Sequence, residues 1–90
     1  MPQEPSRPSP PRKVYLVLPS VHHVMRARDA LAKENIHTET AATPRAISSD
    51  CGVSLVVPEG SIDTIRRLLE GLGLAPEFWA VAGKEIERLG

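Results

Sequence analysis

The sequence has 90 residues, with eleven basic and eleven acidic side chains and a formal net charge of zero. A chain of this length forms one small domain, and its balanced charge excludes a general attraction to nucleic acid or to anionic membranes. Aromatic residues are scarce, which excludes a base-stacking surface. We therefore expect neither a nucleic-acid partner nor a membrane partner.

The first half of the domain is expected to contain a strand followed by a helix. Five of the nine prolines fall within residues 1–12, which lack apolar periodicity and are predicted to form a disordered proline-rich arm. The single domain then covers residues 13–90. Its first segment, residues 13–18, is a continuous apolar run that is typical of a central strand. Ser20 is a suitable N-cap for a helix that runs to about Asn35.

The second half alternates between strand and helix patterns. We expect an edge strand at 36–42, a polar loop at 43–50, a strand at 51–57, a helix capped by Ser61 that ends near Leu72, a strand at 78–82, and a helical turn or frayed end at 84–90. The resulting order, β-α-β-β-α-β, predicts an α+β fold of the ferredoxin-like class. In that fold two helices cover one face of a four-stranded antiparallel sheet.

This topology predicts a functional site at one edge of the sheet. The third strand would lie between the first two and run opposite to them, so the polar loop would meet the start of the first helix. The residues that we expect at this edge are Ser20, His22, His23, Arg45, Ser48, Ser49, Asp50, Cys51 and Gly52. We do not expect these residues to form a metal site.

Cys51 is the only cysteine in the sequence, so it cannot form an intramolecular disulfide. It could be a buried filler, a metal ligand, an intermolecular partner or a reactive sulfur. A chain with one cysteine is no disulfide scaffold, so we expect a reducing, cytoplasmic location. A helix N-terminus and nearby cations favour the nucleophilic thiolate. We therefore expect Cys51 to be reachable from solvent at this edge.

The other residues of the edge have supporting roles in this hypothesis. Gly52 would permit a backbone conformation that presents the sulfur. Arg45 would either bind an anion or pair with Asp50, whose charge does not favour a thiolate. Ser48 and Ser49 would form local turn hydrogen bonds. Adjacent helical residues point about 100° apart, so only one of the two histidines can face the site.

Two segments carry a resemblance to a known family. They are Val14 to Ala27 and, more specifically, Thr43-Pro44-Arg45-x-Ile47-Ser48-Ser49-Asp50-Cys51-Gly52. Across residues 13 to about 83 the chain resembles the small bacterial family of selenium/sulfur carrier proteins. The chain lacks the Cys-Pro-x-Pro motif that begins a helix in better-known small sulfur carriers.

The resemblance implies that Cys51 holds sulfur or selenium as a persulfide or selenosulfide. It also implies a donor protein, such as a cysteine desulfurase, and an acceptor protein. The chain would then be a carrier rather than a stand-alone enzyme, and we expect no cofactor.

Two other functions remain open from the residues themselves. Cys51 with His22 or His23 could bind zinc or copper(I), although structural zinc normally has four ligands. The fold could also serve as a non-catalytic regulatory or interaction domain. The sheet edges and the pair Phe78-Trp79 would allow a homodimer.

Overall fold

The computed structural model describes residues 12–47 and 51–90. Ser48, Ser49 and Asp50 of the predicted site lie outside the described residues, as does the predicted arm up to residue 11. The elements are β1 (Lys13–Val17), α1 (Val21–Lys33), β2 (Glu39–Ala42), β3 (Val53–Val57), the 3₁₀ turn η1 (Glu59–Ser61), α2 (Ile62–Gly71), β4 (Glu77–Ala82) and β5 (Glu85–Arg88).

The strands form one antiparallel sheet in the order β2-β3-β1-β4-β5. The predicted α+β class is confirmed, and β3 lies between β2 and β1 as expected. The predicted number of four strands is wrong, because the segment expected to be a helical turn or a frayed end contains β5. Ala82 pairs with Glu85 across a two-residue turn. Gly83 has φ +61°, which suits the first central position of a type II′ hairpin turn.

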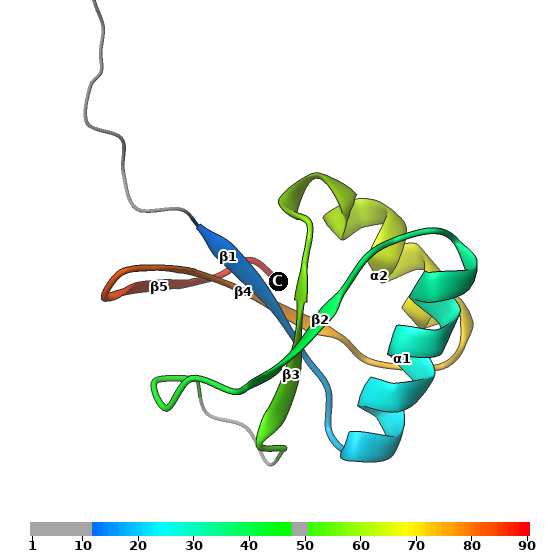
Figure 1. Ribbon diagram of the computed structural model, residues 1–90, viewed down its shortest axis with the longest axis horizontal. Helices are drawn as coiled ribbons and strands as arrows, with labels where there is room; N and C mark the ends of the chain where they lie inside the picture. The colour runs from blue at the N-terminus through cyan, green and yellow to red at the C-terminus, as the bar shows by residue number, and fades with distance from the viewer. Residues whose placement is uncertain (1–11, 48–50) are drawn as a thin grey trace, which may run out of the picture.

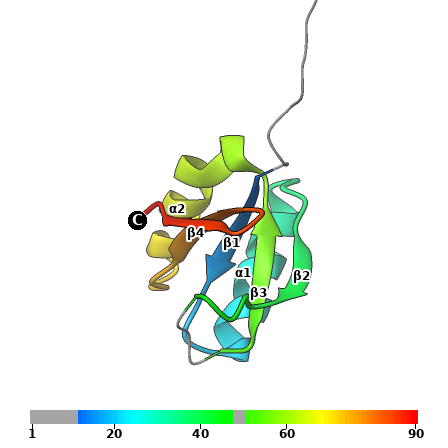
Figure 2. The same ribbon diagram turned by 90° about the vertical axis from the view of Figure 1, so that its left-hand side faces the viewer.

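Both helices lie on the same side of the sheet (Figure 1). Side chains alternate between the two faces of a strand, so Val14 and Leu16 of β1 enter the core with Val24 and Leu31 of α1. Tyr15 points to the opposite face, which the helices leave open and which Figure 2 shows toward the viewer. The sheet therefore has one covered face and one open face.

The helix ends follow the predicted chemistry in part. The Ser20 side chain caps α1 as predicted, since its Oγ accepts a hydrogen bond from the backbone N–H of His23. After α1, Asn35 adopts φ +59°, and after α2 Gly73 adopts φ +78°. The Ser61 side chain makes no cap hydrogen bond, because η1 leads directly into α2. That part of the prediction is wrong.

Arg12 joins the start of β1 to two other elements. Its guanidinium lies 2.6 Å from the Glu59 carboxylate of η1 and 3.8 Å from the Glu87 carboxylate of β5. The expected arm includes Arg12, yet the Arg12 side chain is in contact with the domain.

Candidate functional site

Cys51 lies at the end of the sheet where α1 begins. In β1 and β3, which are antiparallel, Leu16 pairs with Leu55. The end of β1 and the start of β3 therefore lie side by side, and Cys51 comes two residues before β3. The first turn of α1 lies at the same end of the molecule in both views (Figures 1 and 2).

The Cys51 side chain is buried. Only 4% of the residue is exposed, and it belongs to the same apolar cluster as Leu18, Val24 and Leu55. The expectation that Cys51 is reachable from solvent is therefore wrong for this conformation. The reason is the alternation of side chains along the chain, because Cys51 has the same parity as Leu55, which faces the helices.

Thr43 binds the backbone carbonyls of this cysteine and of the residue that follows it. Its N–H donates to the Gly52 carbonyl at 3.0 Å, and its Oγ1 donates to the Cys51 carbonyl at 3.0 Å. The same Oγ1 lies 2.6 Å from the Oγ of Ser54, which is fully buried. A hydroxyl has one proton to donate, so Ser54 must donate to Thr43. We call these three hydrogen bonds the Thr43 clamp.

No role was expected for Thr43, although this residue is the first of the segment that carries the family resemblance. Threonine hydroxyls commonly bind nearby backbone groups in turns, and that tendency is the signal that could have identified it. The prediction that Gly52 provides a backbone conformation closed to other residues is wrong. Its φ is not among the positive values in the described residues, and an added Cβ would meet no atom within 4 Å.

The first turn of α1 contributes three of the predicted site residues. The Ser20 Oγ accepts a hydrogen bond from the backbone N–H of His23 at 3.3 Å. One of the N–H groups that could bind an anion is therefore already occupied. His22 is exposed, and His23 is partly buried. Within the described ranges, His23 Nδ1 is a buried nitrogen that has no hydrogen-bond partner. The two histidines thus differ in environment, as their adjacent positions predict.

Arg45 lies in the segment that follows β2. The segment from Thr43 to Ile47 projects from the sheet on the side away from the helices (Figures 1 and 2). Arg45 itself is exposed, whereas Ile47 is buried. The alternation along β1 places Val17 on this same face, where it is also buried. The predicted grouping of Arg45 with the helix N-terminus stays a prediction.

The metal-binding alternative finds no support in the described part of the chain. Within residues 12–47 and 51–90 there is no group of three or more histidine, cysteine or acidic side chains that could hold a metal ion. Over the same ranges, neither helix combines the length and the apolar character needed to span a bilayer.

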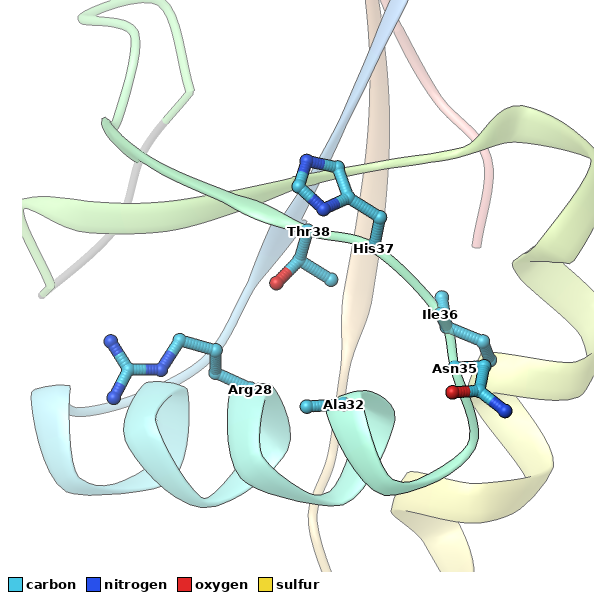
Figure 3. Close-up of a pocket in the computed structure, with 6 residues that line it drawn as sticks. All are labelled: Arg28, Ala32, Asn35, Ile36, His37 and Thr38. Atoms are coloured by element: carbon cyan, nitrogen blue, oxygen red, sulfur yellow. The ribbon is translucent and has the colours of Figure 1, made fainter.

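A separate hollow lies between α1 and the segment that leads into β2, with a volume of about 430 Å³. Its polar groups do not converge on one point. Figure 3 shows the Arg28 side chain directed toward one end of the hollow and the Asn35 amide toward the other, while the His37 ring points away from α1. This hollow therefore lacks the set of converging polar groups that usually orients a small ligand.

The family to which this chain belongs follows from its sequence similarity to a known family. The family described as "Putative Se/S carrier protein-like" matches residues 13–80, about three quarters of the chain. The chain belongs to this family. No curated protein and no solved structure is significantly similar to it.

The match to the carrier family includes Cys51 and the whole Thr43 clamp. It ends inside β4, so β5 lies outside the matched residues. The resemblance recognised in the sequence is thereby confirmed for the family.

Proposed function

We propose that this protein carries sulfur or selenium, bound covalently to the sulfur of Cys51, between a donor protein and an acceptor protein. The observation that carries the proposal is membership of the carrier family, in a chain whose sequence has one cysteine. If the cargo is bound through a thiol of this sequence, Cys51 must be that thiol. We further propose that β1 to β4, with the two helices, form a ferredoxin-like core to which β5 is added.

The exchange chemistry needs no external oxidant. The Cys51 thiolate would attack the outer sulfur of a donor persulfide, forming a new S–S bond to Cys51 as the donor's S–S bond breaks. The donor thiolate leaves with the electron pair, and the sulfane sulfur stays on Cys51. In the second step a thiolate of the acceptor would attack the sulfane sulfur on Cys51. The Cys51 thiolate would then leave with the electron pair. A donor that carries selenium would react by the same displacement.

Burial gives this exchange a specific requirement. An attacking group must reach the sulfur, and Cys51 is only 4% exposed. Loading and unloading would therefore require a local opening at this end of the sheet. Between those events the buried position would shield the sulfane sulfur from other thiols, which is a useful property for a carrier.

Intact-mass spectrometry tests the proposal directly. The purified protein would be incubated with inorganic polysulfide in one arm, and with a cysteine desulfurase and cysteine in another. A third arm would replace cysteine by selenocysteine. We expect a mass gain of one sulfur atom in the first two arms and of one selenium atom in the third, and peptide mapping should place each adduct on Cys51.

The control is Cys51→Ala, which removes the thiol without introducing a buried polar group. It should gain no mass in any arm and should retain the circular dichroism spectrum of the unsubstituted protein. If the unsubstituted protein gains neither sulfur nor selenium in any arm, the carrier proposal is wrong. A gain that persists in Cys51→Ala would also contradict it.

A further inference from the structure

The open face of the sheet differs between its two ends. At the end near Cys51, Ser54 of β3 and Val17 of β1 point to this face and are buried. The Thr43 hydroxyl contacts the Ser54 hydroxyl, and the segment that follows Thr43 lies on this side of the sheet (Figures 1 and 2). The other end of the open face is the end at which the chain enters β1, and its apolar side chains are less well covered.

Five apolar side chains form a continuous patch at this other end. Cross-strand partners point to the same side of a sheet. Tyr15 pairs with both Val56 and Trp79, and Val81, two residues after Trp79, pairs with Ile86. All five residues are only partly buried. A contiguous apolar area that includes tyrosine and tryptophan is typical of a binding surface. We call these five residues the open-face patch.

Charge alone does not identify what covers this patch. Among the strand residues that the structure describes, Lys13 and Arg88 on this face are basic, whereas Glu39 and Glu77 are acidic. The two signs balance, so neither a strongly acidic nor a strongly basic partner is favoured. The occupant should instead match the apolar and aromatic character of the patch.

Trp79 is already held in place within the patch. Its indole N–H donates to the Glu77 carboxylate at 3.1 Å. The Arg88 guanidinium lies 5.9 Å from the centre of the indole ring and 3.7 Å from the Glu77 carboxylate. A large aromatic side chain that is fixed before binding loses little conformational freedom when it is covered. Trp79 is therefore well suited to act as an anchor for an apolar segment.

The sequence before β1 has the chemistry that such a patch binds. Prolines recur at every third position, namely Pro2, Pro5, Pro8 and Pro11. Polyproline II has three residues per turn, so these four rings would lie along one side of such a helix as a continuous ridge. Pro10 would lie on another side. Proline-rich segments in this conformation commonly dock on surfaces lined with aromatic side chains.

Residues 2–11 join the domain beside the open-face patch. Lys13, the first residue of β1, pairs with Val81 of the patch. The Arg12 side chain ties the start of β1 to η1 and to β5 through its ion pairs. Polyproline II rises about 3.1 Å per residue, so the segment from Pro2 to Pro11 would extend about 28 Å. Neighbouring strands are about 4.8 Å apart, so this length is sufficient to cross the patch.

We propose that residues 2–11 form a polyproline II helix that packs on the open-face patch of the same chain, with the proline ridge facing Tyr15 and Trp79. Because the segment is attached directly to β1, its effective concentration at the patch is on the order of millimolar. Contacts too weak to hold a separate peptide therefore suffice. The helices then cover one face of the sheet, and the arm covers the exposed end of the other.

Amide relaxation on the ¹⁵N-labelled full chain gives the first test. The non-proline residues at positions 3, 4, 6, 7 and 9 should have order parameters above about 0.6, the value below which a backbone is flexible. Trp79→Ala should lower these order parameters to those of a free chain. Leu72→Ala removes an apolar side chain that is 41% exposed at the end of α2. It is the matched control and should leave the order parameters unchanged.

Quenching of Trp79 fluorescence by acrylamide tests the proline ridge without changing the domain. Trp79 is the only tryptophan in the sequence, so the signal reports on the patch alone. Pro5→Ala combined with Pro8→Ala should accelerate quenching by about twofold or more, because the indole is then left open to solvent. Pro10→Ala makes the same chemical change off the ridge and should leave the quenching rate unchanged.

Three results would overturn the proposal. One is a set of free-chain order parameters for residues 3–9 in the unsubstituted protein. Another is equal quenching in the Pro10→Ala variant and in the variant that combines Pro5→Ala with Pro8→Ala. The third is shielding of Trp79 that appears only as the protein concentration is raised from micromolar to millimolar, because the patch would then be covered by a second copy of the chain.

Discussion

The Thr43 hydroxyl donates to the Cys51 carbonyl at 3.0 Å while it accepts the proton of the Ser54 hydroxyl at 2.6 Å. These hydrogen bonds connect the buried Ser54 hydroxyl, through the Thr43 hydroxyl, to the backbone carbonyl of Cys51. They fix the position of the Cys51 backbone, whereas the apolar core surrounds the side chain. Changes to Thr43 should therefore alter access to the sulfur without altering the sulfur itself.

Thr43→Val should accelerate the reaction of Cys51 with iodoacetamide under native conditions. The substitution leaves the Cys51 carbonyl and the buried Ser54 hydroxyl without this partner, which should lower the free energy of unfolding by about 1–3 kcal/mol. The backbone N–H of residue 43 still donates to Gly52, so the fold should persist. Alkylation followed by intact mass gives the rate.

Thr40→Val is the matched control for this experiment, because Thr40 is an exposed threonine of β2, three residues before Thr43. It should leave the alkylation rate of Cys51 unchanged. Equal alkylation rates in Thr43→Val and in the unsubstituted protein would show that the clamp does not limit access to the thiol.

The free energy of unfolding of a Cys51 variant should depend on the polarity of the new side chain. Cys51→Ala removes packing from a site that is 4% exposed and should lower the free energy of unfolding by about 1–2 kcal/mol. Cys51→Ser places a hydroxyl in the same apolar cluster and should be less stable than Cys51→Ala by about 1–3 kcal/mol. Urea unfolding followed by Trp79 fluorescence measures both. A serine variant as stable as the alanine variant would argue against the apolar environment.

Two glycines should respond differently to alanine. At Gly52 an added Cβ meets no atom within 4 Å, so Gly52→Ala should change the free energy of unfolding by less than about 0.5 kcal/mol. At Gly73 the φ of +78° disfavours a side chain, so Gly73→Ala should cost about 1 kcal/mol or more. Denaturant unfolding of both variants provides the comparison, and the reverse order of stabilities would be inconsistent with these backbone angles.

Arg12→Ala should have a small, salt-dependent effect. The Arg12 and Glu59 side chains are 40% and 52% exposed, and exposed ion pairs contribute about 0–1 kcal/mol. Thermal unfolding at low salt should show this small loss, and the difference should disappear at about 1 M salt because of screening. A loss above about 2 kcal/mol that persists in high salt would indicate packing by the Arg12 stem instead.

The sequence predicts the main elements because their local signals agree with the final packing. The apolar run at the start of the domain becomes β1, and Ser20 caps α1. The strand β5 was missed because Glu85, Glu87 and Arg88 give it a charged composition that tertiary pairing with β4 overrides. The glycine at position 83, just after a strand pattern, is the local signal for the hairpin.

The site is less predictable than the fold, since it depends on which side of the sheet each segment takes. Topology places Cys51 correctly at the end of the sheet beside α1. The polar residues before it suggested exposure, whereas the alternation that it shares with Leu55 places it in the core. The burial of Ile47, in a segment that is predicted to be a polar loop, could not be predicted from spacing alone.

The strand β5 also determines what kind of assembly the sheet can support. Without it, β4 would be an outer strand, and its unpaired backbone groups could recruit a strand from another molecule. With it, the outer strand on that side is Glu85–Arg88, whose acidic and basic side chains discourage growth of the sheet in that direction. The segment beyond the family match, which contains β5, thus places a charged strand at this edge of the sheet.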